Sequence, residues 1–194
     1  LHQIFALNKK FEKYFKEYNL HKLYKELLNF CSLDLSAFYF DIRKDVLYCD
    51  ELESPHRQIC INLLGLILDI LLKWFAPILS FTTEEIFQIL NKEEKTSIHL
   101  ESFPDIPITW ENQKIFEKWK KLKIVRNVSN AAIEVKRSNK DIGSSLEADV
   151  EVYLDEQYLK LVKDINLSEL FITSNAQAKS MINNDKFFKL EGTD

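Results

Sequence analysis

Apolar residues recur at helical spacing in the first part of the chain. They form two stripes with steps of three and four residues, which places each stripe on one face of a helix. The stripes comprise Ile4, Leu7, Phe11, Tyr14 and Tyr18, then Leu20, Leu23, Tyr24, Leu27 and Phe30. The first helix is expected to end near residues 18 and 19. Because neither stripe is stable in water, both helices are predicted to pack on neighbouring elements.

Residues 35–49 combine an aromatic cluster with a charged segment directly after it. The aromatic part, from Phe38 to Ile42, is predicted to be buried, since each ring contributes roughly 1.5–3 kcal/mol when it leaves water. Arg43, Lys44 and Asp45 follow, and burying an unpaired charge costs more than a ring gains. The pattern therefore predicts a helix end against the core with a cationic corner beside it.

A long central helix is predicted between Ser54 and Pro77. Ser54 is a candidate N-cap, Pro55 suits the first helical position, and Pro77 is expected to end the helix near Phe75. Its apolar residues lie on more than one side, which indicates burial on several faces. A membrane span is the competing interpretation, but a span needs about 20 nearly uncharged residues. The helix contains Asn62, Asp69 and Lys73.

A short helix and a long connection are predicted next. Thr82 and Glu85 form a candidate capping box for a helix that continues to Leu90. Residues 91–110 contain two prolines and are predicted to be a connection with a brief extended run over 98–103.

A second long helix is predicted from about Glu111 to Arg137. Its apolar stripe begins with Ile115, Trp119 and Leu122, and then changes phase to Val125, Val128, Ala132 and Val135. Helical geometry places several polar side chains together opposite the second part. This predicted exposed face comprises Lys123, Arg126, Asn130, Arg137 and Lys140.

After Gly143 the pattern becomes that of an α/β element. Residues 148–154 alternate between apolar and polar, which predicts a strand with one buried face. A helix over 155–163 and a strand over 170–173 complete a predicted right-handed βαβ unit, and a third strand is expected to begin at Phe187. The predicted fold class is thus mainly α, with a helical bundle over residues 1–140 and a small α/β subdomain over 141–194.

Composition indicates an intracellular fragment. The chain has 194 residues, 46% of them hydrophobic, which is enough for a sizeable core, and no signal peptide opens it. It begins with Leu1 and its only methionine is Met181, so a piece of a longer or processed protein is expected. The cysteines, at 31, 49 and 60, suit reduced core thiols of a cytoplasmic protein, and the four histidines lack metal-site spacing.

Charge is distributed unevenly. The formal net charge is -4, yet residues 114–140 hold nine cations and only two anions. Such asymmetry is typical of an electrostatic footprint on nucleic acid. A solvated helix face is the ordinary alternative for a charge run.

Three stretches resemble one family in the same order along the chain. They read LSAFYFDIRKDVLY at 35–48, APILSFTTEEI at 76–86 and IGSSLEA at 142–148. The first is similar to the LSAFYLDIxKDRLY signature of the anticodon-binding domain of bacterial isoleucyl-tRNA synthetases, with Val46 where that family usually has Arg. The middle stretch fits valyl and leucyl relatives equally well, so the other two favour isoleucine. Together they span most of residues 20–175.

The resemblance implies the anticodon-binding helical bundle of a class I aminoacyl-tRNA synthetase, followed by a small α/β element. The parent would be a cytoplasmic, monomeric isoleucine-tRNA ligase that loads isoleucine onto its tRNA with ATP and Mg²⁺ in protein biosynthesis. No cofactor is expected in this chain, which lacks the HIGH and KMSKS motifs, glycine-rich phosphate loops and an editing region. By the same resemblance, a zinc ribbon would follow Asp194.

The chemistry expected of the chain itself is recognition. Proteins read RNA sequence mostly from unpaired bases, by stacking and edge hydrogen bonds, while cations hold phosphates. The candidate RNA-binding residues are Arg43, Lys44, Arg57, Lys73, Lys123, Arg126, Asn130, Arg137 and Lys140. Each taken alone is equally well interpreted as an ordinary surface cation, so the group on the second long helix is the stronger candidate.

Other conspicuous residues have structural interpretations. Trp74 and Trp119 lie in the apolar phase of their helices and are expected in the core first, whereas Tyr48 is open to either interpretation. Ser144, Ser145 and Glu147 are expected to cap a turn between helix and strand.

Two rival functions remain from other classes. A helical protein-interaction module would bind its partner with little dependence on salt, whereas an RNA reader loses affinity steeply as salt rises. A free-standing hydrolase is disfavoured because no nucleophile and base constellation is visible. Reversal of Arg126 and Arg137 to glutamate is the test that the sequence suggests for the long helix.

Overall fold

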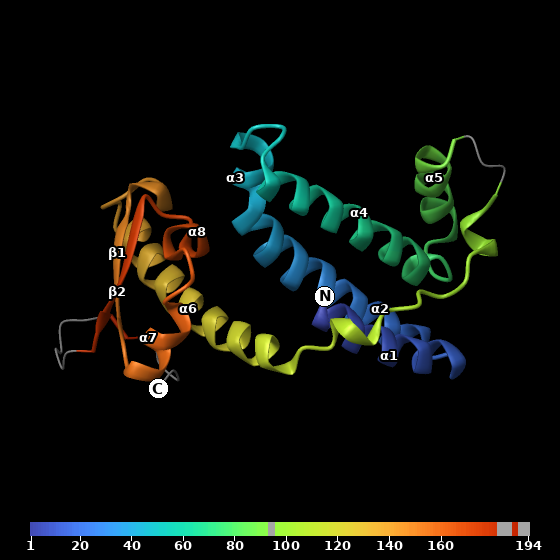
Figure 1. Cartoon of the computed structure of the whole chain (residues 1–194), viewed down its shortest axis with the longest axis horizontal. Coiled ribbons are helices and arrows are strands. Elements are labelled where there is room, and N and C mark those ends of the chain that lie inside the picture. The colour runs from blue at the N-terminus through green and yellow to red at the C-terminus, as the bar shows by residue number, and fades with distance from the viewer. Residues whose placement is uncertain (93–95, 182–187, 190–194) are drawn as a thin grey trace. The chain divides into compact units, whose positions relative to one another are not determined.

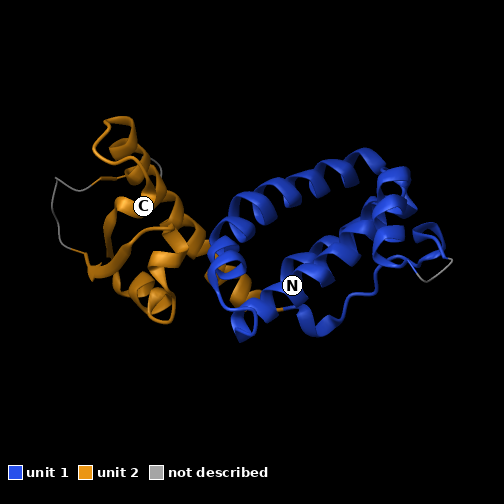
Figure 2. Cartoon of the chain, turned by 90° about the horizontal axis from the view of Figure 1, so that it is seen from above, with its two compact units in different colours: residues 1–111 blue, residues 112–194 orange. Residues whose placement is uncertain are grey.

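The chain is mainly helical, with one small parallel sheet, which confirms the predicted fold class (Figure 1). The computed structural model describes residues 1–92, 96–181, 188 and 189. Two compact units divide the chain, residues 1–111 and 112–194 (Figure 2). These units divide before the predicted domain boundary at residues 140 and 141, because helix α6 (Gln113–Ser138) packs on α7 (Glu156–Val162) and α8 (Leu167–Phe171).

The first two helices confirm the predicted stripes. Helix α1 spans His2–Lys16 and α2 spans Leu20–Asn29. Phe11 and Leu23 are completely buried, and Leu7 and Tyr14 pack against the same core. Tyr18 is wrongly placed on the buried stripe: α1 has ended, its φ is 54°, and its side chain is 89% exposed.

The charged segment at 43–45 does not form a corner. The helical run continues from α2 through a π-helical segment, η1 (Phe30–Phe40), into α3 (Asp41–Cys49). The predicted helix end and cationic corner are therefore wrong. Burial of the aromatic cluster is only partly confirmed, since Ile42 is buried while Phe40 is 40% exposed. A π turn takes one residue more than an α turn. Residues that would face the core at α-helical spacing are therefore rotated away from it.

Helix α4 (Pro55–Phe75) has the predicted bounds, with proline in its first turn. Ser54 makes no side-chain cap, and its hydroxyl donates instead to Asp50 Oδ2 at 3.0 Å. Ile67, Ile70 and Trp74 belong to one core cluster, whereas Leu72 lies on another side of the helix and belongs to a second cluster with Phe87 and Ile98. The predicted burial on more than one face is therefore confirmed, although Ile59 and Leu66 are exposed. By length and composition alone α4 could cross a membrane, a test that the core helix of a water-soluble protein also passes.

The core of the first unit is built around Trp74. Its ring meets Phe11 edge to face, with the ring centroids 4.8 Å apart, and lies near Phe30 in a similar way. The indole Nε1 donates to Asn8 Oδ1 at 2.9 Å, and Asn8 Nδ2 donates to the Pro104 carbonyl at 2.9 Å. A single buried amide thus joins α1, α4 and the connection.

Helix α5 (Ser80–Leu90) begins before the predicted capping box. Thr82 is its third residue, so the capping box is wrong. Glu84 instead joins the connection to this helix, because its Oε2 accepts from Ser97 Oγ at 2.8 Å and from the Ile98 amide at 3.0 Å. Those bonds favour a 3₁₀ turn, η2 (Ile98–Leu100), where an extended run was predicted. A second turn, η3, spans Ile108–Trp110.

The link through Glu84 makes a prediction for acid stability. Hydrogen bonds from Ser97, and then from Gln88, hold the pKa of the Glu84 carboxyl below its ordinary value of 4.5. A group with a depressed pKa stabilises the fold above its unfolded pKa and loses that contribution as pH falls through its folded pKa. Glu84→Gln is therefore expected to lower the melting temperature at pH 7, with a difference that shrinks towards pH 3. Glu85→Gln, on the exposed side of α5, is the matched control, and an equal shift in that variant would contradict the assignment.

The second unit holds the predicted βαβ order. Strand β1 (Asp149–Leu154) pairs in parallel with β2 (Asn175–Ser180), and α7 lies between them in the chain after an N-cap at Asp155. The second strand was predicted over 170–173. That position is wrong, because Leu170 and Phe171 are buried helix residues of α8. The third predicted strand, at Phe187, lies outside the described residues.

The three cysteines differ in burial. Cys60 is buried, whereas Cys49 is exposed, so the prediction of core thiols is wrong for Cys49. No group of histidine, cysteine or acidic residues that suits a metal ion occurs within the described ranges.

Candidate nucleic-acid-binding surface

The predicted RNA-binding residues are divided between the two units. Arg43, Lys44, Arg57 and Lys73 belong to the first unit, on α3 and α4. The other five belong to α6 and the turn after it.

Cations at the junction of α3 and α4 have protein partners. Lys44 Nζ lies 3.4 Å from Asp41 Oδ1. Arg57 Nε donates to the Leu47 carbonyl at 3.0 Å, which ties the start of α4 to α3. Arg43 is half-buried. These contacts favour a structural role for Arg57 and leave Lys44 as the exposed member of the group.

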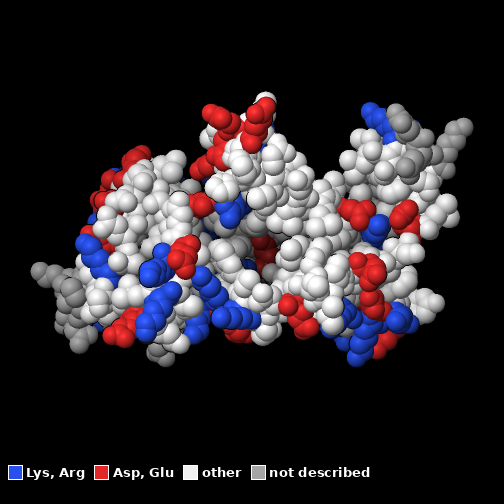
Figure 3. Space-filling view, viewed as in Figure 1, with Lys and Arg blue, Asp and Glu red and all other residues white. Residues whose placement is uncertain are grey.

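Acidic residues surround the same junction. Asp45, Glu51 and Glu53 are all exposed, and Figure 3 shows Asp and Glu atoms gathered at the turn that links α3 to α4. Negative charge repels phosphate groups, so this end of the unit is a poor electrostatic match for RNA. Tyr48 is 88% exposed beside it.

Lys73 lies at the other end of α4. Its Nζ is 3.1 Å from Asp69 Oδ2 and 3.6 Å from Glu101 Oε2, and only 19% of its side chain is exposed. It lines a small pocket of about 210 Å³ with Phe15 and Phe103, whose rings stack 6.0 Å apart. Lys73 is thus neutralised by two carboxylates.

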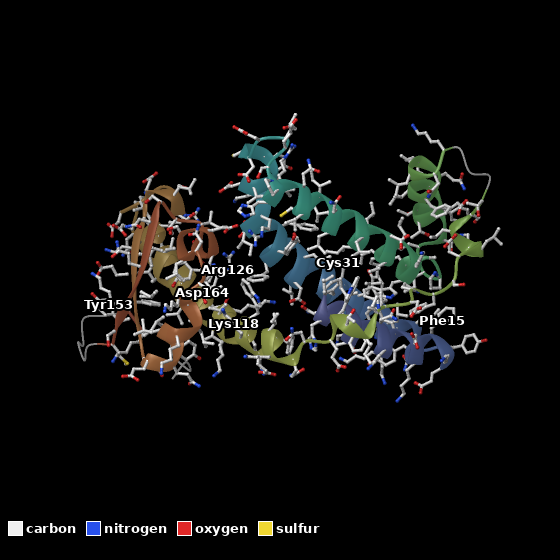
Figure 4. The ribbon with its side chains drawn as sticks, in the orientation of Figure 1. Phe15, Cys31, Lys118, Arg126, Tyr153 and Asp164 are labelled. Carbon is white, nitrogen blue, oxygen red and sulfur yellow. The ribbon has the colours of Figure 1, made fainter. Side chains whose placement is uncertain are left out.

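Arg126 contradicts the predicted exposed face. Only 5% of the residue is exposed, and its guanidinium donates to the Leu170 carbonyl in α8. Figure 4 labels this side chain where α6 and α8 meet. The predicted exposure of Arg126 is therefore wrong, and its guanidinium has a packing role between α6 and α8. The helical pattern missed this because a long arginine can bury its stem and still satisfy its donors on a carbonyl.

The remaining polar residues of α6 differ in exposure. Lys123 and Asn130 are half-buried, whereas Arg137 and Lys140 are exposed at the C-terminal end. Figure 3 shows Lys and Arg atoms clustered over the part of the second unit that holds α6. The uneven charge seen in the sequence is therefore present as a basic surface, although its members are not one straight row.

An open pocket lies at the C-terminal end of α6. It has a volume of about 460 Å³, and sequence reasoning found only its two cations. Its lining comprises Glu134, Arg137, Ser138, Lys140, Ile142 and Gly143. Of the missed residues, Glu134 and Ser138 lie at the end of α6, whereas Ile142 and Gly143 lie in the turn after it. Helical phase alone therefore gave no signal that they share a pocket.

Lys140 has an unusual backbone. Its φ is 62°, in the left-handed region, which costs a residue with a Cβ about 1–2 kcal/mol and which helix ends usually assign to glycine. Gly143 follows three residues later, and its amide donates to Glu147 Oε2 at 3.0 Å. Ser144 Oγ accepts from the Leu146 amide at 3.3 Å. Capping by Ser144 and Glu147 is thus confirmed.

Several other aromatic and basic side chains are buried or in contact with protein groups. Trp119 is half-buried, and Trp74 in the first unit is completely buried, which confirms the core interpretation for Trp74. A hydrogen bond to Glu151 raises the pKa of Lys179, so that ammonium is charged but held on the sheet. Lys121 lies over the Tyr158 ring, 6.0 Å from its centroid.

Comparison with known proteins gives a consistent result. The family model described as the anticodon-binding domain of tRNA ligase matches residues 1–154. The chain is 53% identical over 176 residues to the isoleucine-tRNA ligase of Pelagibacter ubique, covering 91% of this chain and 19% of that protein. It is 38% identical over 176 residues to that of Mesorhizobium japonicum, and 39% identical over 175 residues to that of Agrobacterium fabrum. Each of these covers 90% of this chain and 18% of the relative. The chain therefore spans about a fifth of the length of these relatives.

Proposed function

Because this chain belongs to the family of anticodon-binding domains of tRNA ligases, we propose that it recognises the anticodon of isoleucine tRNA within an isoleucine-tRNA ligase. The observation that carries this proposal is 53% identity to such a ligase over 91% of the chain. The stretches at 35–48 and 142–148 support isoleucine over valine or leucine, whereas the stretch at 76–86 fits all three relatives equally well. The complete enzyme would attach isoleucine to its tRNA with ATP.

The chain itself would contribute binding rather than chemistry. ATP and Mg²⁺ would act in another domain, and a zinc ribbon would be a separate part of the same enzyme. We propose a cytoplasmic monomer. In that setting α4 is a bundle helix, an interpretation supported by Asp69 and Lys73 near its end and by the buried Trp74.

The RNA-contacting surface is proposed to lie on the second unit. Lys123, Asn130, Arg137 and Lys140 offer donors there, whereas the junction of α3 and α4 in the first unit carries the exposed acids Asp45, Glu51 and Glu53. Arg43, Lys44, Arg57 and Lys73 are weaker candidates because three of them, Lys44, Arg57 and Lys73, already contact protein oxygens. The sequence-specific part of recognition would come from unpaired anticodon bases.

Salt dependence tests this proposal. If about four phosphates are contacted, log K should fall with log salt at a slope of roughly -3, so affinity drops roughly 50-fold between 50 and 200 mM salt. The measurement is binding of the complete ligase to isoleucine tRNA at several salt concentrations. Isoleucine tRNA with a swapped anticodon should bind more weakly at every concentration.

Competing tRNAs provide the control. Valine and leucine tRNAs should compete poorly, and preference for either would move the chain to a valyl or leucyl ligase. Equal binding of the original and swapped anticodons would contradict anticodon recognition. Binding that ignores salt would instead support the protein-interaction alternative, which the exposed apolar residues Ile59 and Leu66 of α4 also suggest.

A further inference from the structure

The pocket at the end of α6 has the charge and size for an oxyanion. Two of its six lining residues are cations, Arg137 and Lys140, and Ser138 adds a hydroxyl. Glu134 is its single acid. A tetrahedral phosphate group is far smaller than the pocket volume of about 460 Å³, so a phosphate within a nucleotide chain can enter with its neighbours still attached.

The backbone of Lys140 points to a use for its side chain. Glycine adopts a φ of 62° at no steric cost, whereas lysine does not. Strained residues of this kind cluster at binding sites, where the surrounding structure holds them in place. A lysine in this position costs stability, so its ammonium is the feature that glycine would lack.

The helix end itself does not require that ammonium. The last carbonyls of α6 already accept backbone hydrogen bonds: Asn139 N donates to Val135 O at 3.1 Å, Lys140 N to Arg137 O at 2.9 Å, and Asp141 N to Lys136 O at 3.0 Å. Lys136 lies in the last turn of α6, where a cation interacts favourably with the helix dipole. Its ammonium also forms an ion pair with Asp141 at 3.0 Å. Lys140 lies beyond the last turn and lines the pocket.

Arg137 has an exchangeable partner. Its Nη1 lies 2.6 Å from Glu134 Oε1, and both side chains are about half exposed, at 47% and 62%. An exposed pair of this kind is worth little in water, while a guanidinium can bind phosphate through two parallel hydrogen bonds. Glu134 therefore orients Arg137 in the empty pocket and competes with an incoming anion.

We propose that this pocket binds one phosphate of the tRNA backbone, with Lys140 and Arg137 as its cationic contacts and Glu134 as the competitor that phosphate displaces. The proposal rests on the proposed function and names the chemical group that this part of the surface contacts. A backbone phosphate is the same for every sequence, so the pocket positions the tRNA and does not read its anticodon.

Lys140→Gly separates binding from folding. The variant should melt at or above the temperature of the complete wild-type ligase, since glycine relieves the left-handed backbone. Its affinity for isoleucine tRNA should fall about tenfold near 0.1 M salt, and the salt slope should become shallower by about 1. The same loss should occur with the anticodon-swapped tRNA.

Two further variants sharpen the test. Glu134→Gln removes the competitor of Arg137 and should tighten binding of both tRNAs. Lys136→Ala removes one positive charge from the last turn of α6, near the pocket but outside its lining, so it is the matched control and should change affinity less than threefold. The proposal would be contradicted if Lys140→Gly bound tRNA with wild-type affinity, or if Lys136→Ala lost as much affinity as Lys140→Gly. A lower melting temperature for Lys140→Gly would equally overturn it, because the lysine would then be structural.

Failure of the pocket and failure of the proposed function give different results. If the wild-type ligase binds both tRNAs equally but Lys140→Gly still loses affinity, the phosphate pocket is supported and anticodon recognition is contradicted. If the ligase prefers the original anticodon and Lys140→Gly has wild-type affinity for tRNA, anticodon recognition is supported and the phosphate pocket is contradicted. Absence of any tRNA binding by the wild-type ligase removes both.

Discussion

Replacing Trp74 with alanine is expected to lower the free energy of unfolding of the first unit by about 3–5 kcal/mol, the range for emptying a buried aromatic site. The side chain is completely buried and its ring meets two others, Phe11 and Phe30. Its loss also leaves Asn8 Oδ1 without the indole donor. Denaturant unfolding followed by circular dichroism measures the change.

Trp74→Phe separates the two contributions. Phenylalanine keeps a smaller aromatic ring and lacks the indole donor, so the expected loss is mainly the cost of an unsatisfied buried acceptor, about 1–3 kcal/mol. Tyr48→Ala, at a position 88% exposed, is the control and should stay within about 0.5 kcal/mol of wild type. Equal losses in Trp74→Ala and Tyr48→Ala would show that the core is centred elsewhere.

Arg126→Glu is expected to destabilise the second unit by about 3–5 kcal/mol, because it leaves an uncompensated charge in a buried site. The glutamate would also face the Leu170 carbonyl, which now accepts a hydrogen bond from the guanidinium. Loss of tRNA binding in this variant would therefore follow from unfolding. The measurement is the urea midpoint of the chain alongside its far-ultraviolet circular dichroism.

The comparison with Arg137→Glu makes this test informative. Arg137 is exposed on the same helix, so its reversal should change stability by no more than about 0.5 kcal/mol and should reduce tRNA affinity. The two reversals thus act through different causes, although the sequence suggested one shared face. Equal stability of Arg126→Glu and Arg137→Glu would contradict the buried position of Arg126.

Periodicity predicted the elements whose cores are made of large apolar residues. The stripes of α1, α2 and α4 and the alternation of β1 come from such side chains, and burial drives their placement. The strand β2 was misplaced because its sequence, NAQAKS, contains no β-branched or aromatic residue, whereas Leu170 and Phe171 beside it do look like a strand. Tertiary packing decides such cases.

The candidate site was predictable in charge but not in geometry. Nine cations in 114–140 were visible in the sequence, yet the count could not tell Arg126, whose donors meet a carbonyl, from Arg137, which remains in solvent. The pocket depends on a left-handed residue after α6, and lysine gives no sequence signal for that conformation. Helical phase alone therefore overstated the size of the exposed face.

In the π-helical segment η1, residues 30–40, the number of residues is more constrained than the identity of the side chains. An α-helix advances by about 100° per residue, so losing one residue there would turn every downstream side chain of α3 by roughly that angle about the axis. Arg57 would then lose the carbonyl of Leu47 that it now meets. Exposed positions such as Ser36 and Ala37 can accept other side chains. The number of residues between α2 and α3, in contrast, sets the rotation of α3 about its axis and cannot change without turning that helix.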